Sequence, residues 1–124
     1  MSRSRGSAPL DFILGSAPIL MIALTSIGII LNGYSKNIAQ FTAVDAARYA
    51  ALADETPGQA ESRAEAALMA QLSALYRPNV KVERMTAGSQ CSMVASVTLA
   101  PVAFGFVRLT AEIKEVSSAV CEVQ

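Results

Sequence analysis

Residues Ser7–Tyr34 read SAPLDFILGSAPILMIALTSIGIILNGY and form the longest apolar stretch of the chain. No Lys, Arg, Asp or Glu occurs between Phe12 and Ser35. A helix needs about 20 mostly apolar residues to cross the hydrocarbon of a bilayer, and this stretch is long enough. The sequence therefore predicts a single-pass membrane protein whose helix spans the bilayer over about residues 12–34.

The segment before this stretch, Met1–Gly6, carries Arg3 and Arg5 and no acidic residue. The positive-inside rule places this end in the cytoplasm and the bulk of the chain outside. Such a start fits an uncleaved signal anchor or a cleavable secretory signal. The apolar stretch is longer than the usual core of a secretory signal, about 7–15 residues, and no A-x-A step follows it.

Asp11 lies at the edge of the apolar stretch, a few residues after the basic leader. A carboxylate costs about 2.5–3.5 kcal/mol at the centre of a membrane helix and less near the interface, so it usually has a partner. If a peptidase cuts after Gly6, Ser7 becomes the new amino terminus. Its ammonium group in one subunit could then pair with Asp11 of a neighbouring subunit and fix their register.

The stretch RGSAPLDFILGSAPILMIAL (5–24), with Pro18 inside it, and the later DAARYAALAD (45–54) together resemble TadE-like pseudopilins of tight-adherence pili. These belong to the type IV pilin-like precursors. The resemblance covers roughly residues 5–54, and Asp11 stands where the family usually has Glu. It implies cleavage by a prepilin peptidase between Gly6 and Ser7, subunit pairing through Asp11, and assembly by dedicated membrane proteins.

Composition argues against catalysis and against nucleic-acid binding. Lys plus Arg number 10 and Asp plus Glu number 10, so the net charge is zero and no basic patch points to nucleic acid. Histidine is absent, which removes the usual general base and the commonest metal ligand. Neither a phosphate loop nor a nucleophile motif occurs. We therefore expect no enzyme activity, catalytic residue, metal site, cofactor or small-molecule substrate.

The helix should continue beyond the membrane, giving one long element over residues 7–53. Beyond Lys36 its apolar residues keep a spacing near 3.6 and predict a buried stripe of Ile38, Phe41, Val44, Ala47 and Leu52. Thr56, Pro57 and Gln59 then form a capping-box pattern that starts a second helix, Pro57 to about Tyr76. Pro18 should kink or loosen the first helix near Leu14–Pro18.

After Pro78 the apolar period changes to two, which indicates strands with one buried face. Three alternating runs include Val80–Val82, Met93–Leu99 and Val107–Ile113, joined by turns at 87–89 and 101–105. A bulge or break is expected between Ile113 and Val116. We predict an α+β fold: a basic leader (1–6), a long helix (7–53) and an extracytoplasmic domain (54–124), with an antiparallel sheet of 3–4 strands.

Both cysteines, Cys91 and Cys121, follow the membrane helix. Outside the cell they could form a disulfide that staples the carboxyl-terminal end. Two buried free thiols are the alternative.

The expected role is a minor pilin or pseudopilin that acts in pilus biogenesis or adhesion at the cell surface. Its expected partners are a prepilin peptidase, other pilins, pilus-assembly membrane proteins and the lipid bilayer. The alternative is a signal-anchored extracellular binding domain that never polymerises.

Overall fold

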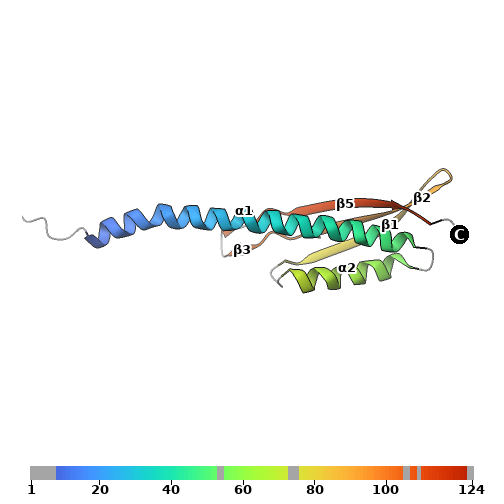
Figure 1. The fold of residues 1–124 in the computed structure, drawn as a ribbon, viewed down its shortest axis with the longest axis horizontal. Helices are drawn as coiled ribbons and strands as arrows, with labels where there is room; N and C mark the ends of the chain where they lie inside the picture. Colours follow the sequence, from blue (N-terminus) through green and yellow to red (C-terminus); the bar gives the residue numbers. More distant parts are fainter. Residues whose placement is uncertain (1–7, 53–54, 73–75, 105–106, 109, 123–124) are drawn as a thin grey trace, which may run out of the picture.

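The computed structural model describes residues 8–52, 55–72, 76–104, 107–108 and 110–122. Its elements follow the chain in the order helix, helix and strands, as Figure 1 shows. The helices are α1 (Ala8–Ala51) and α2 (Pro57–Gln71), and the strands are β1 (Pro78–Ala87), β2 (Gln90–Leu99), β3 (Ala103–Phe104), β4 (Val107–Arg108) and β5 (Ile113–Val120). The fold is α+β, with one long helix whose second half carries a small domain.

Helix α1 is one continuous element of 44 residues. At a rise of 1.5 Å per residue it is about 66 Å long. Pro9 lies in the first turn, where a missing N–H costs nothing. Pro18 lies inside the helix, which continues through it as one element. The last carbonyl of α1, that of Ala51, accepts a hydrogen bond of 3.0 Å from the N–H of Glu122, so the end of the chain caps this helix.

Helix α2 begins as the sequence predicts and ends earlier. The Thr56 hydroxyl accepts a hydrogen bond from the N–H of Gln59, whose side chain accepts in turn from the N–H of Thr56. This reciprocal pair is the predicted capping box, with Pro57 in the first turn. The helix ends at Gln71, before the predicted Tyr76, because Leu72 takes an extended backbone and closes the last turn onto the carbonyl of Leu68.

The main sheet is antiparallel with strand order β1-β2-β5. Strands β1 and β2 form a hairpin in which Ala87 pairs with Gln90, leaving a two-residue turn. The first turn residue, Gly88, has φ +65°, a conformation open to glycine and costly for other residues. On the opposite edge of β2, Leu99 pairs with Ile113 and Ser92 with Val120.

The third strand starts later than the sequence predicts. Strand β4 ends at Arg108, and β5 runs from Ile113 to Val120 in unbroken register with β2, so the expected bulge between Ile113 and Val116 is absent. The break lies instead around Thr110. Its hydroxyl accepts a hydrogen bond of 2.8 Å from the N–H of Val102, and its own N–H donates to the Val102 carbonyl at 3.3 Å. This closure sets β3 and β4 apart as a separate small hairpin.

The face of α1 that packs on the domain differs from the predicted stripe. Ala47 of that stripe is buried and Ile38 packs against the core, but Phe41 is 69% exposed and Leu52 46% exposed. The buried face consists mainly of alanines, together with Ser35 and Thr42. Small side chains bring the helix backbone close to the sheet and to α2, which a Phe or Leu would hold apart. The buried alanines are Ala39, Ala43, Ala46, Ala47, Ala50 and Ala51.

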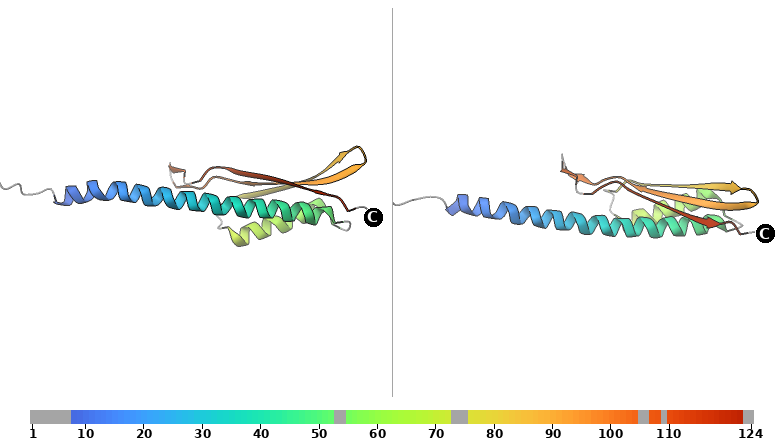
Figure 2. Two further views of the ribbon diagram at one scale, coloured as in Figure 1. Left: turned by 45° about the horizontal axis from the view of Figure 1, so that its top comes forward. Right: turned by 90° about the horizontal axis from the view of Figure 1, so that it is seen from above.

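The domain forms two layers, with the sheet on one side and both helices on the other (Figures 1 and 2). The inward face of β2 buries Met93, Ala95, Val97 and Leu99, as the alternation predicts. Side-chain contacts also tie the helices to each other and to the sheet. The Arg63 guanidinium lies 4.5 Å from the centre of the Tyr49 ring, and Lys36 Nζ lies 3.9 Å from Glu115 Oε1.

Candidate assembly site on the amino-terminal helix

The first half of α1 presents apolar side chains on all sides, and up to Ile27 the described residues of the chain bury none of them. Every residue from Ala8 to Ile27 is exposed, including Phe12 at 75% and Met21 at 73%. This run of about 20 residues rises about 30 Å, the thickness of bilayer hydrocarbon. A helix that is apolar all round must be covered by lipid or by other apolar helices. In the described residues, α1 is the one helix long and apolar enough to cross a membrane.

The hydroxyl groups in this half of α1 are all satisfied within the helix. Ser16 donates to the carbonyl of Ile13 at 3.2 Å, and Thr25 donates to the carbonyl of Met21 at 2.7 Å. The Ser26 hydroxyl likewise donates to a carbonyl one turn back, at 2.8 Å. In hydrocarbon an unpaired polar group costs several kcal/mol, so this pattern suits a helix surrounded by lipid.

Asp11 lies in the first turn of α1, and its side chain is exposed. A carboxylate there also interacts favourably with the positive end of the helix dipole, typically by about 0.3–1 kcal/mol. Gly6 and Ser7, the predicted cleavage residues, lie outside the described residues. The geometry therefore puts the one acid of the apolar segment within a turn of the start of the described helix, at the end farthest from the domain (Figure 1).

The opposite end of the molecule is closed by a disulfide between Cys91 and Cys121, one of the two alternatives that the sequence left open. Their Cα atoms are 5.4 Å apart, and the N–H of Cys121 donates to the carbonyl of Cys91 at 3.0 Å. The register that pairs Ser92 with Val120 brings the two cysteines opposite each other. Disulfides persist in oxidising compartments, which indicates that this domain is extracytoplasmic.

The acidic residues around β5 and the methionines of the domain are dispersed over the described residues. Glu115 is half-buried and pairs with Lys36, while Glu112 and Glu122 are exposed. Among the described residues, no cluster of Cys, Asp or Glu could hold a metal ion. Of the three methionines of the domain, Met93 is buried in the core, whereas Met69 is 67% exposed and Met85 55% exposed.

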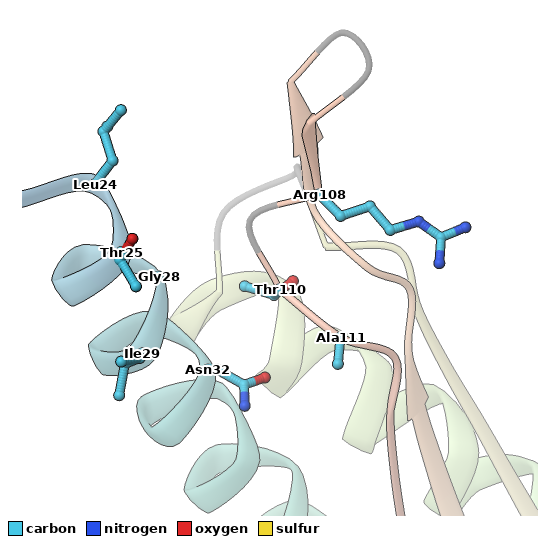
Figure 3. A pocket seen from close by; sticks show the side chains of 8 residues that line it. All are labelled: Leu24, Thr25, Gly28, Ile29, Asn32, Arg108, Thr110 and Ala111. Atoms are coloured by element: carbon cyan, nitrogen blue, oxygen red, sulfur yellow. The ribbon is translucent and has the colours of Figure 1, made fainter. Parts of the chain in front are cut away.

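A feature that the sequence did not predict is a recess of about 340 Å³ between α1 and the base of the β3–β4 hairpin. Figure 3 shows Asn32 and Thr110 on its two walls, with the Arg108 side chain pointing away from α1. Gly28 is the first buried residue of α1 and lies at this level. No local pattern in the sequence predicts this recess, because its walls come from segments far apart in the chain.

A long amino-terminal apolar helix, packed in its second half against a small antiparallel sheet that contains a disulfide, is a pilin-like architecture. Comparison with protein-family models, with curated proteins and with solved structures found no match to this chain.

Proposed function

We propose that this chain is a minor pilin or pseudopilin of a tight-adherence type IV pilus and acts in pilus biogenesis or adhesion. The observation that carries the proposal is the division of α1 into two halves. Its first half is uncovered and uncharged apart from Asp11, and its second half is covered by its own domain. Such a helix can lie in lipid before assembly and among other apolar helices afterwards. The role is structural, without catalysis or a cofactor.

In the proposed cycle the basic leader holds the amino end in the cytoplasm, and the disulfide-bonded domain folds outside. A prepilin peptidase then cuts between Gly6 and Ser7. The new ammonium of Ser7 in one subunit and the Asp11 carboxylate of another attract each other strongly when apolar helices surround them, because the dielectric constant there is low. Pilus-assembly membrane proteins and other pilins are the partners.

Two substitutions at Asp11 test the pairing in the host bacterium. Asp11→Asn keeps the size and removes the charge, whereas Asp11→Glu keeps the charge. We expect Asp11→Asn to be lost from the surface filaments sheared off the cells while remaining at the normal level in the membrane, and Asp11→Glu to be recovered with the filaments. Recovery of Asp11→Asn at the wild-type level would contradict the pairing. A wild-type chain that never appears in sheared filaments would favour the non-polymerising anchored domain.

A further inference from the structure

Helix α1 carries large apolar side chains on an exposed side of its second half, beyond the expected membrane span. Tyr34 is 51% exposed, and Phe41 and Leu52 are exposed as well. Phe41 follows Tyr34 by about two whole turns of helix, and Leu52 follows Phe41 by about three. The three side chains therefore lie on one line along the helix, where a partner could cover them together.

This line is turned away from the domain of its own chain. Successive residues of a helix turn by about 100°, so Ala39 and Ala43, each two residues from Phe41, lie on the opposite side of α1. Both alanines are buried in the core. In the right panel of Figure 2, α1 runs along one margin of the molecule, with the sheet on its other side. The domain thus leaves the line of Tyr34, Phe41 and Leu52 open.

The line continues into the membrane half of α1 without a change of side. Alternating steps of three and four residues lead from Tyr34 back to Leu20, and every large side chain on this path is exposed. Such steps are the heptad pattern by which two helices wind around each other. We call this line the seam; its apolar members are Leu20, Leu24, Ile27, Leu31, Tyr34, the half-buried Ile38, Phe41 and Leu52.

Two opposite charges occupy the seam between Phe41 and Leu52. The same steps of four and three residues place Asp45 and then Arg48 there, and both are exposed. Neither forms an ion pair with another of the described residues. An occupant that fits this part of the seam must bring a cation near Asp45 and an anion near Arg48, one level further along the helix.

A second copy of this chain meets that requirement. Two copies that cross the same bilayer in the same direction stand parallel and at the same height, so each residue of the seam faces its own counterpart. Asp45 of one copy then lies one level, about 4.5 Å along the axis, from Arg48 of the other, and the reverse pair is equivalent. The two pairs offset the repulsion between like charges within each level.

We propose that two copies of this chain pair side by side in the membrane, parallel and in register, along the seam of α1. The contact runs from the membrane span to Leu52 and leaves the domains on the outer sides of the helix pair. The inference rests on the membrane-spanning role of α1 in the proposed function, and it needs neither leader cleavage nor polymerisation.

Cysteine cross-linking in vesicles tests this pairing. We would reconstitute the full, oxidised chain in phosphatidylcholine–phosphatidylglycerol vesicles without any other protein and oxidise added thiols with copper phenanthroline. Phe41→Cys is the reporter and Tyr34→Cys a second one. Gln40→Cys, exposed at the same height but about 100° around the helix, is the matched control. The wild type, whose Cys91 and Cys121 are joined to each other, gives the background.

We expect about fivefold more covalent dimer on a non-reducing gel from Phe41→Cys than from Gln40→Cys, because facing core positions of a helix pair are close. Adding Asp45→Arg to Phe41→Cys puts four cations in neighbouring levels and should reduce the dimer severalfold. Exchanging the two charges, Asp45→Arg with Arg48→Asp, should restore it. Circular dichroism checks that each variant keeps its helix and sheet, and Asp45→Lys replaces Asp45→Arg should that variant fold poorly.

Equal dimer from Phe41→Cys and Gln40→Cys would mean random collision, and the inference would be wrong. A dimer that ignores Asp45→Arg, or that the charge exchange does not restore, would also contradict pairing along the seam. Either result leaves the proposed function standing, because that function is tested by the recovery of Asp11 variants in filaments. Conversely, normal recovery of Asp11→Asn in filaments would leave the pair in vesicles unaffected.

Discussion

The carboxylate of Glu61 accepts a hydrogen bond of 2.8 Å from the backbone N–H of Val82. One turn further along α2, Glu65 accepts from the N–H of Val80 at 3.5 Å. Strand β1 is an edge of the sheet, so these N–H groups have no neighbouring strand. The two acids of α2 thus satisfy and cover an edge that could otherwise pair with another chain.

This relationship predicts an asymmetric response at Glu61. Glu61→Ala leaves a half-buried N–H without an acceptor and should lower the free energy of unfolding of the outer domain by about 1–2 kcal/mol. Glu61→Gln keeps an acceptor oxygen and should cost less. Urea unfolding in detergent micelles, followed by circular dichroism, measures both. An exposed acid on β1, Glu83, gives the control Glu83→Ala. Equal midpoints for Glu61→Ala and Glu83→Ala would contradict the role given to Glu61.

The disulfide should contribute more to stability than any single hydrogen bond. Cys91 and Cys121 are 30 residues apart, and closing a loop of this size stabilises by about 3–4 kcal/mol in the chain-entropy model. We expect the double variant Cys91→Ser with Cys121→Ser to unfold at a much lower urea concentration than the oxidised wild type. The reduced wild type should have the same urea midpoint as the double variant. If reduction leaves the urea midpoint of the wild type unchanged, the disulfide does not stabilise the domain.

The buried alanines of α1 predict that a larger side chain destabilises the domain on this face of the helix and leaves its stability unchanged at exposed positions of α1. Ala43 is 1% exposed, so Ala43→Leu overpacks the contact with the domain and should cost about 1–3 kcal/mol. The same change at Ala23, which is exposed in the first half of α1, is the matched control and should leave the unfolding of the domain unchanged. Differential urea midpoints of these two variants test the packing. Identical midpoints would mean that α1 is not seated on the domain through this face.

Processing should depend on the residue before the cut. Gly6→Leu places a bulky side chain at the predicted cleavage position, and we expect the chain to keep its leader in cells that contain a prepilin peptidase. Gel mobility of the wild type and the variant, each compared with the unprocessed chain, measures this. As a control, Ser4→Ala alters the leader away from the cut and should be processed normally. Equal mobility of Gly6→Leu and the wild type would count against cleavage at this site.

Much of the fold could be predicted from the sequence, because the elements concerned are each determined by a pattern of neighbouring residues. The uncharged run of α1, the capping box at Thr56 and the alternation of β2 are of this kind. The buried face of α1 was predicted only in part: Ala47 is buried, but Phe41 is exposed. Hydrophobicity favours Phe41 over Ala43, whereas close packing between elements favours the smaller side chain. The place where the third strand starts depends on Thr110 bonding to Val102, a contact between segments that no local pattern contains. The recess between α1 and Thr110 likewise follows only from the assembled fold.

The central claim is that the chain matures into a subunit whose amino terminus is Ser7. Intact-mass analysis of the protein purified from its own host measures this directly. The account predicts a mass lacking Met1–Gly6, with fragments that begin at Ser7. A protein that still begins at Met1, or that has lost the whole apolar segment, would contradict it.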